Sequence, residues 1–116
     1  MVTSWEVARL TAGSLDLIDL WGHDDEVVIV DAMKSGAPPG TVTRIDAITQ
    51  RLPKGAFSST HAFGPAAVVE LARTMQRLPR SLIVYGIEAS QVDHGAAMSP
   101  EVAAAVSDVA KELENA

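Results

Sequence analysis

Two side chains in this sequence, Asp31 and His61, have types and positions that suit metal binding or acid–base chemistry. Asp31 closes the apolar run of residues 27–30, where an unpaired carboxylate is costly to bury. His61 lies in segment 58–64, just before a predicted helix. Carboxylate and neutral imidazole are usual protein ligands of nickel and zinc. If both residues reach the same edge of a sheet, they predict a metal-binding or catalytic site.

Each of these residues also has a purely structural explanation. Asp31 can cap a turn at a strand end, and His61 can be a loop histidine that is hydrogen-bonded to backbone. Two ligands are fewer than the three of a catalytic zinc-type site. His94, beside Asp93, is a further candidate for the same edge, whereas His23 lies in a charged loop and is expected at the surface.

Other common catalytic patterns are absent from the sequence. It contains no Gly-x-Ser-x-Gly elbow, no His-Glu-x-x-His and no phosphate-binding glycine-rich loop. The absence of cysteine excludes disulfides, thiolate metal sites and a cysteine nucleophile. Ser58 and Ser59 precede His61, but proximity along the chain does not make a nucleophile–base pair. These residues therefore leave an Asp/His site as the candidate.

Strands and helices that alternate along the chain must position these residues. Alternating or continuous apolar residues predict strands over 5–11, 27–30, 41–46 and 81–87. Helical spacing and capping residues predict helices over 14–22, 64–78 and from residue 99 onward. Gly22 is expected to supply a left-handed stop, Pro79 to end the second helix and Ser99 to cap the third. Turns are expected in the loop of residues 34–40.

This order of elements predicts an α/β fold. We expect a three-layer sandwich, in which a mostly parallel twisted sheet carries helices on both faces. In such sheets, ligands bind beyond the carboxyl ends of the strands. The rule places Asp31 and the loop before the 64–78 helix at the edge where chemistry is expected.

Length and composition restrict the class of protein. The chain has 116 residues, which predicts a single domain over residues 1–116. Its net charge of −6 argues against nucleic acid as a partner. No apolar run approaches the roughly 18 residues of a membrane span, and the N-terminus does not resemble a signal peptide. A cytoplasmic location with no membrane partner is expected.

Three segments resemble the hydrogenase maturation proteases. Residues 30–42 resemble their Asp-Ala-x-x-Ser-Gly-x-x-Pro-Gly-Thr block, and residues 59–64 resemble their Ser-x-His-x-x-Gly block. Residues 85–88 and 98–102 match the closing strand and the start of the last helix. Residues 12–19 resemble a further segment less closely. Together these segments span nearly the whole chain.

The resemblance implies a specific activity. These cytosolic endopeptidases remove the C-terminal extension from the large-subunit precursor of nickel-iron hydrogenase after nickel insertion. Their site joins an acidic residue of an N-terminal loop to an aspartate and a histidine, which correspond here to Asp31 and His61. Both residues are therefore expected to be catalytic and to contact nickel that the substrate carries, with no organic cofactor. The metal would polarise the scissile peptide, with a bound water as nucleophile.

The sequence departs from the family at its N-terminus. No Gly-Asn-x-x-x-x-Asp-Asp-Gly-x-Gly loop precedes Trp5, and Asp24 and Asp25 do not replace it. The fold is therefore expected to be N-terminally truncated relative to the family, and an uncovered sheet edge predicts self-association. Two alternatives stay open: a non-catalytic remnant or partner-binding module of this family, and an unrelated metal hydrolase of small molecules.

Overall fold

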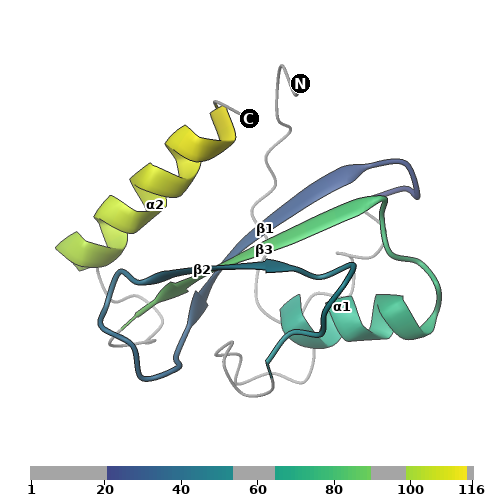
Figure 1. The fold of residues 1–116 in the computed structure, drawn as a ribbon, viewed down its shortest axis with the longest axis horizontal. Helices are drawn as coiled ribbons and strands as arrows, with labels where there is room; N and C mark the ends of the chain where they lie inside the picture. Colours follow the sequence, from purple (N-terminus) through teal and green to yellow (C-terminus); the bar gives the residue numbers. More distant parts are fainter. Residues whose placement is uncertain (1–20, 54–64, 90–98, 115–116) are drawn as a thin grey trace.

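The computed structural model describes residues 21–53, 65–89 and 99–114 (Figure 1). Its elements, in chain order, are β1 (Glu26–Met33), β2 (Val42–Asp46), α1 (Pro65–Thr74), β3 (Ser81–Glu88) and α2 (Pro100–Glu114). This order confirms the prediction from residue 27 onward. The strand predicted over residues 5–11 and most of the helix predicted over 14–22 lie outside the described residues.

The three described strands form one sheet in the order β1-β3-β2. β1 and β3 are parallel, with Glu26 opposite Ser81 and Met33 opposite Glu88. β2 is antiparallel to β3 and lies on its other side, with Val42 opposite Ile87. The sheet is therefore mixed in this part of the chain. The predicted parallel pair supplies its two longer strands.

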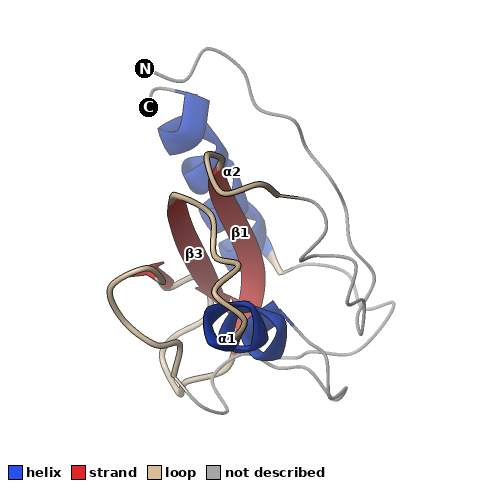
Figure 2. Ribbon diagram, turned by 90° about the vertical axis from the view of Figure 1, so that its right-hand side faces the viewer, coloured by secondary structure: helices blue, strands red, loops and turns tan. Residues whose placement is uncertain are grey.

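The two helices cover opposite faces of the sheet (Figures 1 and 2). α1 packs Val69 against Leu82 and Val84 of β3. α2 packs Ala105 and Val109 against the other face of β3. This arrangement confirms the three-layer α/β sandwich. Among the described residues, no helix combines the length and apolar character needed to cross a membrane.

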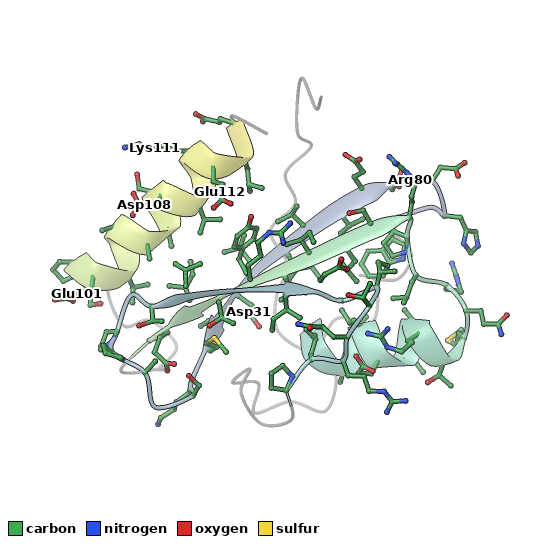
Figure 3. All side chains as sticks on the ribbon, viewed as in Figure 1. Asp31, Arg80, Glu101, Asp108, Lys111 and Glu112 are labelled. Carbon is green, nitrogen blue, oxygen red and sulfur yellow. The ribbon has the colours of Figure 1, made fainter. Side chains whose placement is uncertain are left out.

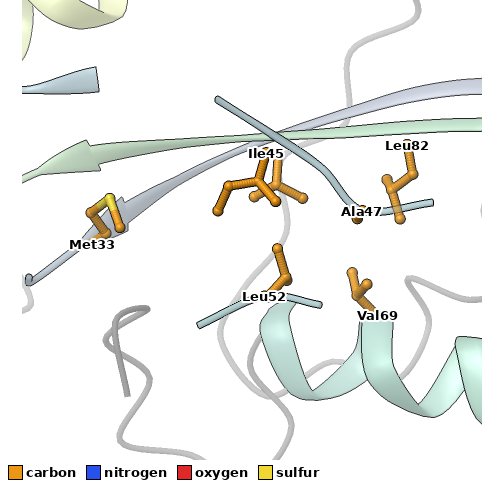
Figure 4. Close-up of a cluster of buried hydrophobic side chains, with 7 residues drawn as sticks. Met33, Ile45, Ala47, Leu52, Val69 and Leu82 are labelled. Carbon is orange, nitrogen blue, oxygen red and sulfur yellow. The ribbon is translucent and has the colours of Figure 1, made fainter. Parts of the chain in front are cut away.

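A buried apolar cluster lies between the sheet and α1 (Figure 4). Its members are Met33, Ile45, Ala47, Leu52, Val69, Leu82 and Val84. Burying a side chain of valine or leucine size contributes about 1.5–3 kcal/mol. The Arg73 guanidinium of α1 also donates hydrogen bonds to the carbonyl oxygens of Ala47 and Gln50, at 2.6 and 3.2 Å. The cluster thus fixes α1 on one face of the sheet.

The second predicted helix ends earlier than expected. α1 stops at Thr74, and Gln76 takes the left-handed conformation with a φ of 57°. The amides of Gln76 and Arg77 donate to the carbonyl oxygens of Arg73 and Ala72, at 3.2 and 2.8 Å. These two bonds form a Schellman motif, which closes the helix before Pro79 is reached. The expectation that Pro79 ends the helix is therefore wrong.

The predictions for two other helix ends, at Ser99 and at Gly22, have different outcomes. Ser99 caps α2 as predicted, since the Val102 amide donates to its hydroxyl oxygen at 3.3 Å. By contrast, Trp21 and Gly22 are not helical. The Gly22 amide instead donates to the Asp25 carboxylate at 2.7 Å. Gly22 is not among the glycines with positive φ, so its expected left-handed stop is wrong.

Candidate functional site

Asp31 lies within β1, near the carboxyl end of the parallel strand pair (Figure 3). It pairs with Gly86, and the strand continues for two further residues to Met33. The sequence predicted that Asp31 closes the strand, and this prediction is wrong because β1 ends at Met33. Because side chains alternate along a strand, Asp31 shares its face with Met33, which packs on the α1 side of the sheet. The carboxyl end of the sheet thus carries an acid on the α1 face.

On the β3 side of Asp31, the next position across the sheet carries no side chain. Gly86 pairs with Asp31 on one side and with Thr43 on the other. Residues paired in this way point to the same face, and neighbouring strands lie about 4.8 Å apart. Asp31 and Thr43 are therefore about 10 Å apart across a position that carries no side chain.

Burial raises the pKa of the Asp31 carboxyl above its ordinary value. A hydrogen bond from the Ala32 amide to Asp31 Oδ1, at 2.9 Å, opposes this shift in part. The carboxyl therefore keeps its proton to a higher pH than an exposed aspartate does. A half-buried acid with a raised pKa suits proton transfer, and its ionised form suits contact with a cation.

Sequence reasoning did not single out a second acid in this region, Glu88 at the end of β3. Its side chain is 2% exposed. Its carboxylate accepts hydrogen bonds from the Ser35 amide, at 2.9 and 3.0 Å, and from the Ser35 hydroxyl, at 2.6 Å. The Ser35 hydroxyl in particular holds the pKa of Glu88 below its ordinary value. The sequence did offer a signal for Glu88, because an acid directly follows a run of apolar residues there. The same signal identified Asp31.

The loop of residues 34–40 is attached at its other end through Gly40. The Gly40 amide donates to the Glu88 carbonyl oxygen at 2.9 Å. Gly40 has a φ of +88°, and a Cβ at this position would lie 2.8 Å from the carbonyl oxygen of Glu101 in α2. Only glycine allows this approach without a shift of the helix. The loop is therefore held between β3 and α2.

Of the three histidines in the sequence, His23 is the one that lies among the described residues. His23 is exposed in the turn before β1, at the opposite end of the strand from Asp31, as predicted for a surface residue. His61, His94 and the two serines near His61 lie outside the described residues, so the pairing of Asp31 with His61 stays a prediction. Within the described ranges, no three His, Cys, Asp or Glu side chains are grouped so that they could hold a metal ion.

Comparison of the sequence with protein families gives a match over nearly the whole chain. The hydrogenase maturation protease model matches residues 4–116. The hydrogenase expression/formation protein HupD of Thiocapsa roseopersicina is 30% identical over 105 residues, which are 87% of this chain and 48% of HupD. The chain thus spans about half the length of this curated relative.

Two solved structures have a similar fold. The [NiFe] hydrogenase maturation protease HybD from Thermococcus kodakarensis has a TM-score of 0.67 and 27% identity, covering 95% of this chain and 79% of HybD. The hydrogenase maturating endopeptidase HybD from E. coli has a TM-score of 0.61, covering 87% of this chain and 63% of that protein. At 18% identity, the second likeness shows the fold alone. These similarities confirm the predicted α/β fold, and the chain matches only part of each structure.

Proposed function

Because the chain belongs to the hydrogenase maturation protease family, we propose that it is an endopeptidase that removes the C-terminal extension of a nickel-iron hydrogenase large-subunit precursor. It acts after nickel insertion and in the cytoplasm. The name of the Thermococcus relative, a [NiFe] hydrogenase maturation protease, supports this substrate class. The family match over residues 4–116 is the observation that carries the proposal.

Asp31 is the described residue that we assign to the chemistry. It stands near the carboxyl end of two parallel strands, the usual place for ligand binding in such sheets. It belongs to the segment that matches the Asp-Ala-x-x-Ser-Gly pattern. Its half-buried setting raises its pKa and supports a part in metal contact or proton transfer.

His61 is assigned as the partner of Asp31 on the basis of the family pattern. In this proposal, Asp31 and His61 contact the nickel that the precursor carries. The metal acts as a Lewis acid on the scissile peptide, and Asp31 orients the attacking water. The nickel is part of the substrate, so the chain needs no resident metal or organic cofactor of its own.

The test uses one precursor in two states. The purified chain is incubated with nickel-loaded and with nickel-free hydrogenase precursor, and the mass of the large subunit is followed by mass spectrometry. The proposal predicts that the C-terminal extension is lost only from the nickel-loaded form. Equal cleavage of both forms would contradict nickel recognition. Binding of the nickel-loaded form without cleavage would fit a partner-binding module instead.

A further inference from the structure

The loop of residues 34–40 is an exposed segment that begins three residues after Asp31. The side chains of Lys34, Pro38 and Pro39 are exposed to solvent. Gly36 has a φ of +94°, and a Cβ there would meet no atom within 4 Å. The two prolines restrict the backbone of the loop. An exposed loop of this kind beside the candidate site is suited to contact a peptide.

A buried carboxylate fastens this loop to the sheet. Glu88 is the one charged side chain found buried in the ranges that the structure describes. Its carboxylate accepts from the Ser35 amide and hydroxyl, at distances from 2.6 to 3.0 Å. The main chain of Glu88 also donates to the Thr41 carbonyl oxygen, at 2.8 Å. A buried charge is costly unless it is hydrogen-bonded, and here its bonds go to the loop.

The fastening point lies close to Asp31. Glu88 pairs with Met33, two residues along β1 from Asp31, and both acids belong to the α1 face by strand alternation. The strand rise and spacing separate their Cα atoms by about 8 Å. A shift of the loop would therefore break the bonds of a carboxylate that lies one strand across and two residues along from Asp31.

We infer that Glu88 is a positioning residue, whose carboxylate holds loop 34–40 as a fixed binding surface for the precursor peptide beside Asp31. This inference rests on the proposed function for its substrate. It assigns Glu88 to substrate binding and leaves the chemistry to Asp31. Glu88 acts through its hydrogen bonds to Ser35, so its charge is not essential.

Two substitutions separate hydrogen bonding from charge. Glu88→Ala removes every acceptor that Ser35 uses. Glu88→Gln keeps an oxygen that accepts from the Ser35 amide, and its NH₂ group donates to the Ser35 hydroxyl oxygen. A positioning role therefore predicts that Glu88→Gln behaves like the wild type. An acid–base or metal-ligand role predicts that both variants fail.

The first measurement is amide hydrogen exchange at Ser35, with the Val84 amide of β3 as an internal reference. Exchange at Ser35 is expected to accelerate about tenfold or more in Glu88→Ala and to stay near the wild-type rate in Glu88→Gln. Val84 reports whether the sheet itself has opened. An unchanged Ser35 rate in Glu88→Ala would overturn the fastening role, whether or not the chain cleaves any precursor.

The second measurement is single-turnover cleavage of nickel-loaded precursor over a range of chain concentrations, which gives Kd with Asp31 intact. Glu88→Ala is expected to weaken this Kd about tenfold or more, and Glu88→Gln to leave it within about threefold. If Glu88 serves only to keep the chain folded, Glu88→Ala lowers the fraction of protein that can bind and leaves the Kd of that fraction unchanged. An unchanged Kd, or equal losses in the two variants, overturns the positioning role.

The two measurements also separate this inference from the proposed function. If Ser35 exchange responds as expected but the wild-type chain neither binds nor cleaves the precursor, the fastening of the loop stands. In that case the proposed substrate, and with it the peptide-binding role of the loop, is overturned.

Discussion

Asp31 and Gly86 lie side by side on the parallel strands β1 and β3, so the carboxylate has a neighbour without a side chain on its own face of the sheet. Beyond Gly86, the row continues to Thr43 of β2. The strand that holds Asp31 is fixed by a full ladder of eight pairs with β3. A parallel strand pair therefore presents the acid beside a position that carries no side chain.

The setting of Asp31 predicts a pH-dependent change in stability. Burial raises its folded pKa above the ordinary value of 3.8. The folded state therefore binds the proton more tightly, and ionisation of Asp31 reduces stability as the pH rises through the folded pKa. Asp31→Asn removes this cost while an amide oxygen still accepts from Ala32. We expect Asp31→Asn to have the higher Tm at pH 7, with a difference that shrinks below pH 4.

Thermal unfolding followed by circular dichroism at a series of pH values checks this prediction. A variant that is less stable than the wild type at pH 7 contradicts it. So does a Tm difference that grows on acidification. Either result would mean that burial does not penalise the ionised form of Asp31.

The surroundings of two loop glycines predict that substitution by alanine lowers the free energy of unfolding by different amounts. Gly36 and Gly40 both have positive φ, so an alanine at either position is strained. Only at Gly40 would the added Cβ also meet the backbone of Glu101, at 2.8 Å. We expect Gly40→Ala to lower the free energy of unfolding by about 1–3 kcal/mol more than Gly36→Ala does.

Chemical denaturation of the two variants measures this difference, and Gly36→Ala is the matched control for backbone strain. Equal losses of unfolding free energy in the two variants would show that Gly40 does not lie close to the first turn of α2. A larger loss in Gly36→Ala would reverse the order that the geometry requires.

The end of α1 predicts a stabilising substitution. Gln76 holds a left-handed conformation, which costs an L-residue about 1–2 kcal/mol. Glycine adopts this conformation freely but loses more entropy on folding, so we expect Gln76→Gly to stabilise the chain by about 0.5–1 kcal/mol. Gln76→Ala keeps the backbone strain and serves as the control. The free energy of unfolding in urea distinguishes them, and a destabilised Gln76→Gly would argue against the Schellman motif.

The sequence predicted the core of this fold because its strongest patterns are local. The β-branched run before Asp31 and the apolar residues 81–87 became the parallel pair. The Ser99 cap and the following proline correctly placed the start of α2. These patterns reflect burial on both faces of a central strand and the unpaired amides of a first helical turn.

Other features depend on pairing that no local pattern encodes. The strand at Asp31 extends to Met33 because Ala32 and Met33 pair with Ile87 and Glu88. The direction of β2 is set by its antiparallel pairing with β3. The early end of α1 depends on a left-handed glutamine, where a glycine is the usual signal.

For the candidate site, local patterns predicted one position. Asp31 was identified by its place after an apolar run, and the structure places it two residues before the end of β1, near the carboxyl end of the parallel pair. Its role in the chemistry stays a prediction. The fastening of Ser35 by Glu88 joins residues that are 53 positions apart. Such a contact is decided by the register of β3 against β1, which the sequence pattern does not specify.

The assignment of Asp31 to the chemistry is tested most directly by the cleavage of nickel-loaded hydrogenase precursor by Asp31→Asn, compared with the wild type and with Asp46→Asn. Asp46 is a strand aspartate on β2, at the far end of the sheet, and an asparagine there still offers an oxygen to the Ile48 amide. We expect Asp31→Asn to lower kcat/KM by about a hundredfold or more and Asp46→Asn to retain wild-type cleavage. Undiminished removal of the C-terminal extension by Asp31→Asn would contradict the assignment of Asp31 to the chemistry.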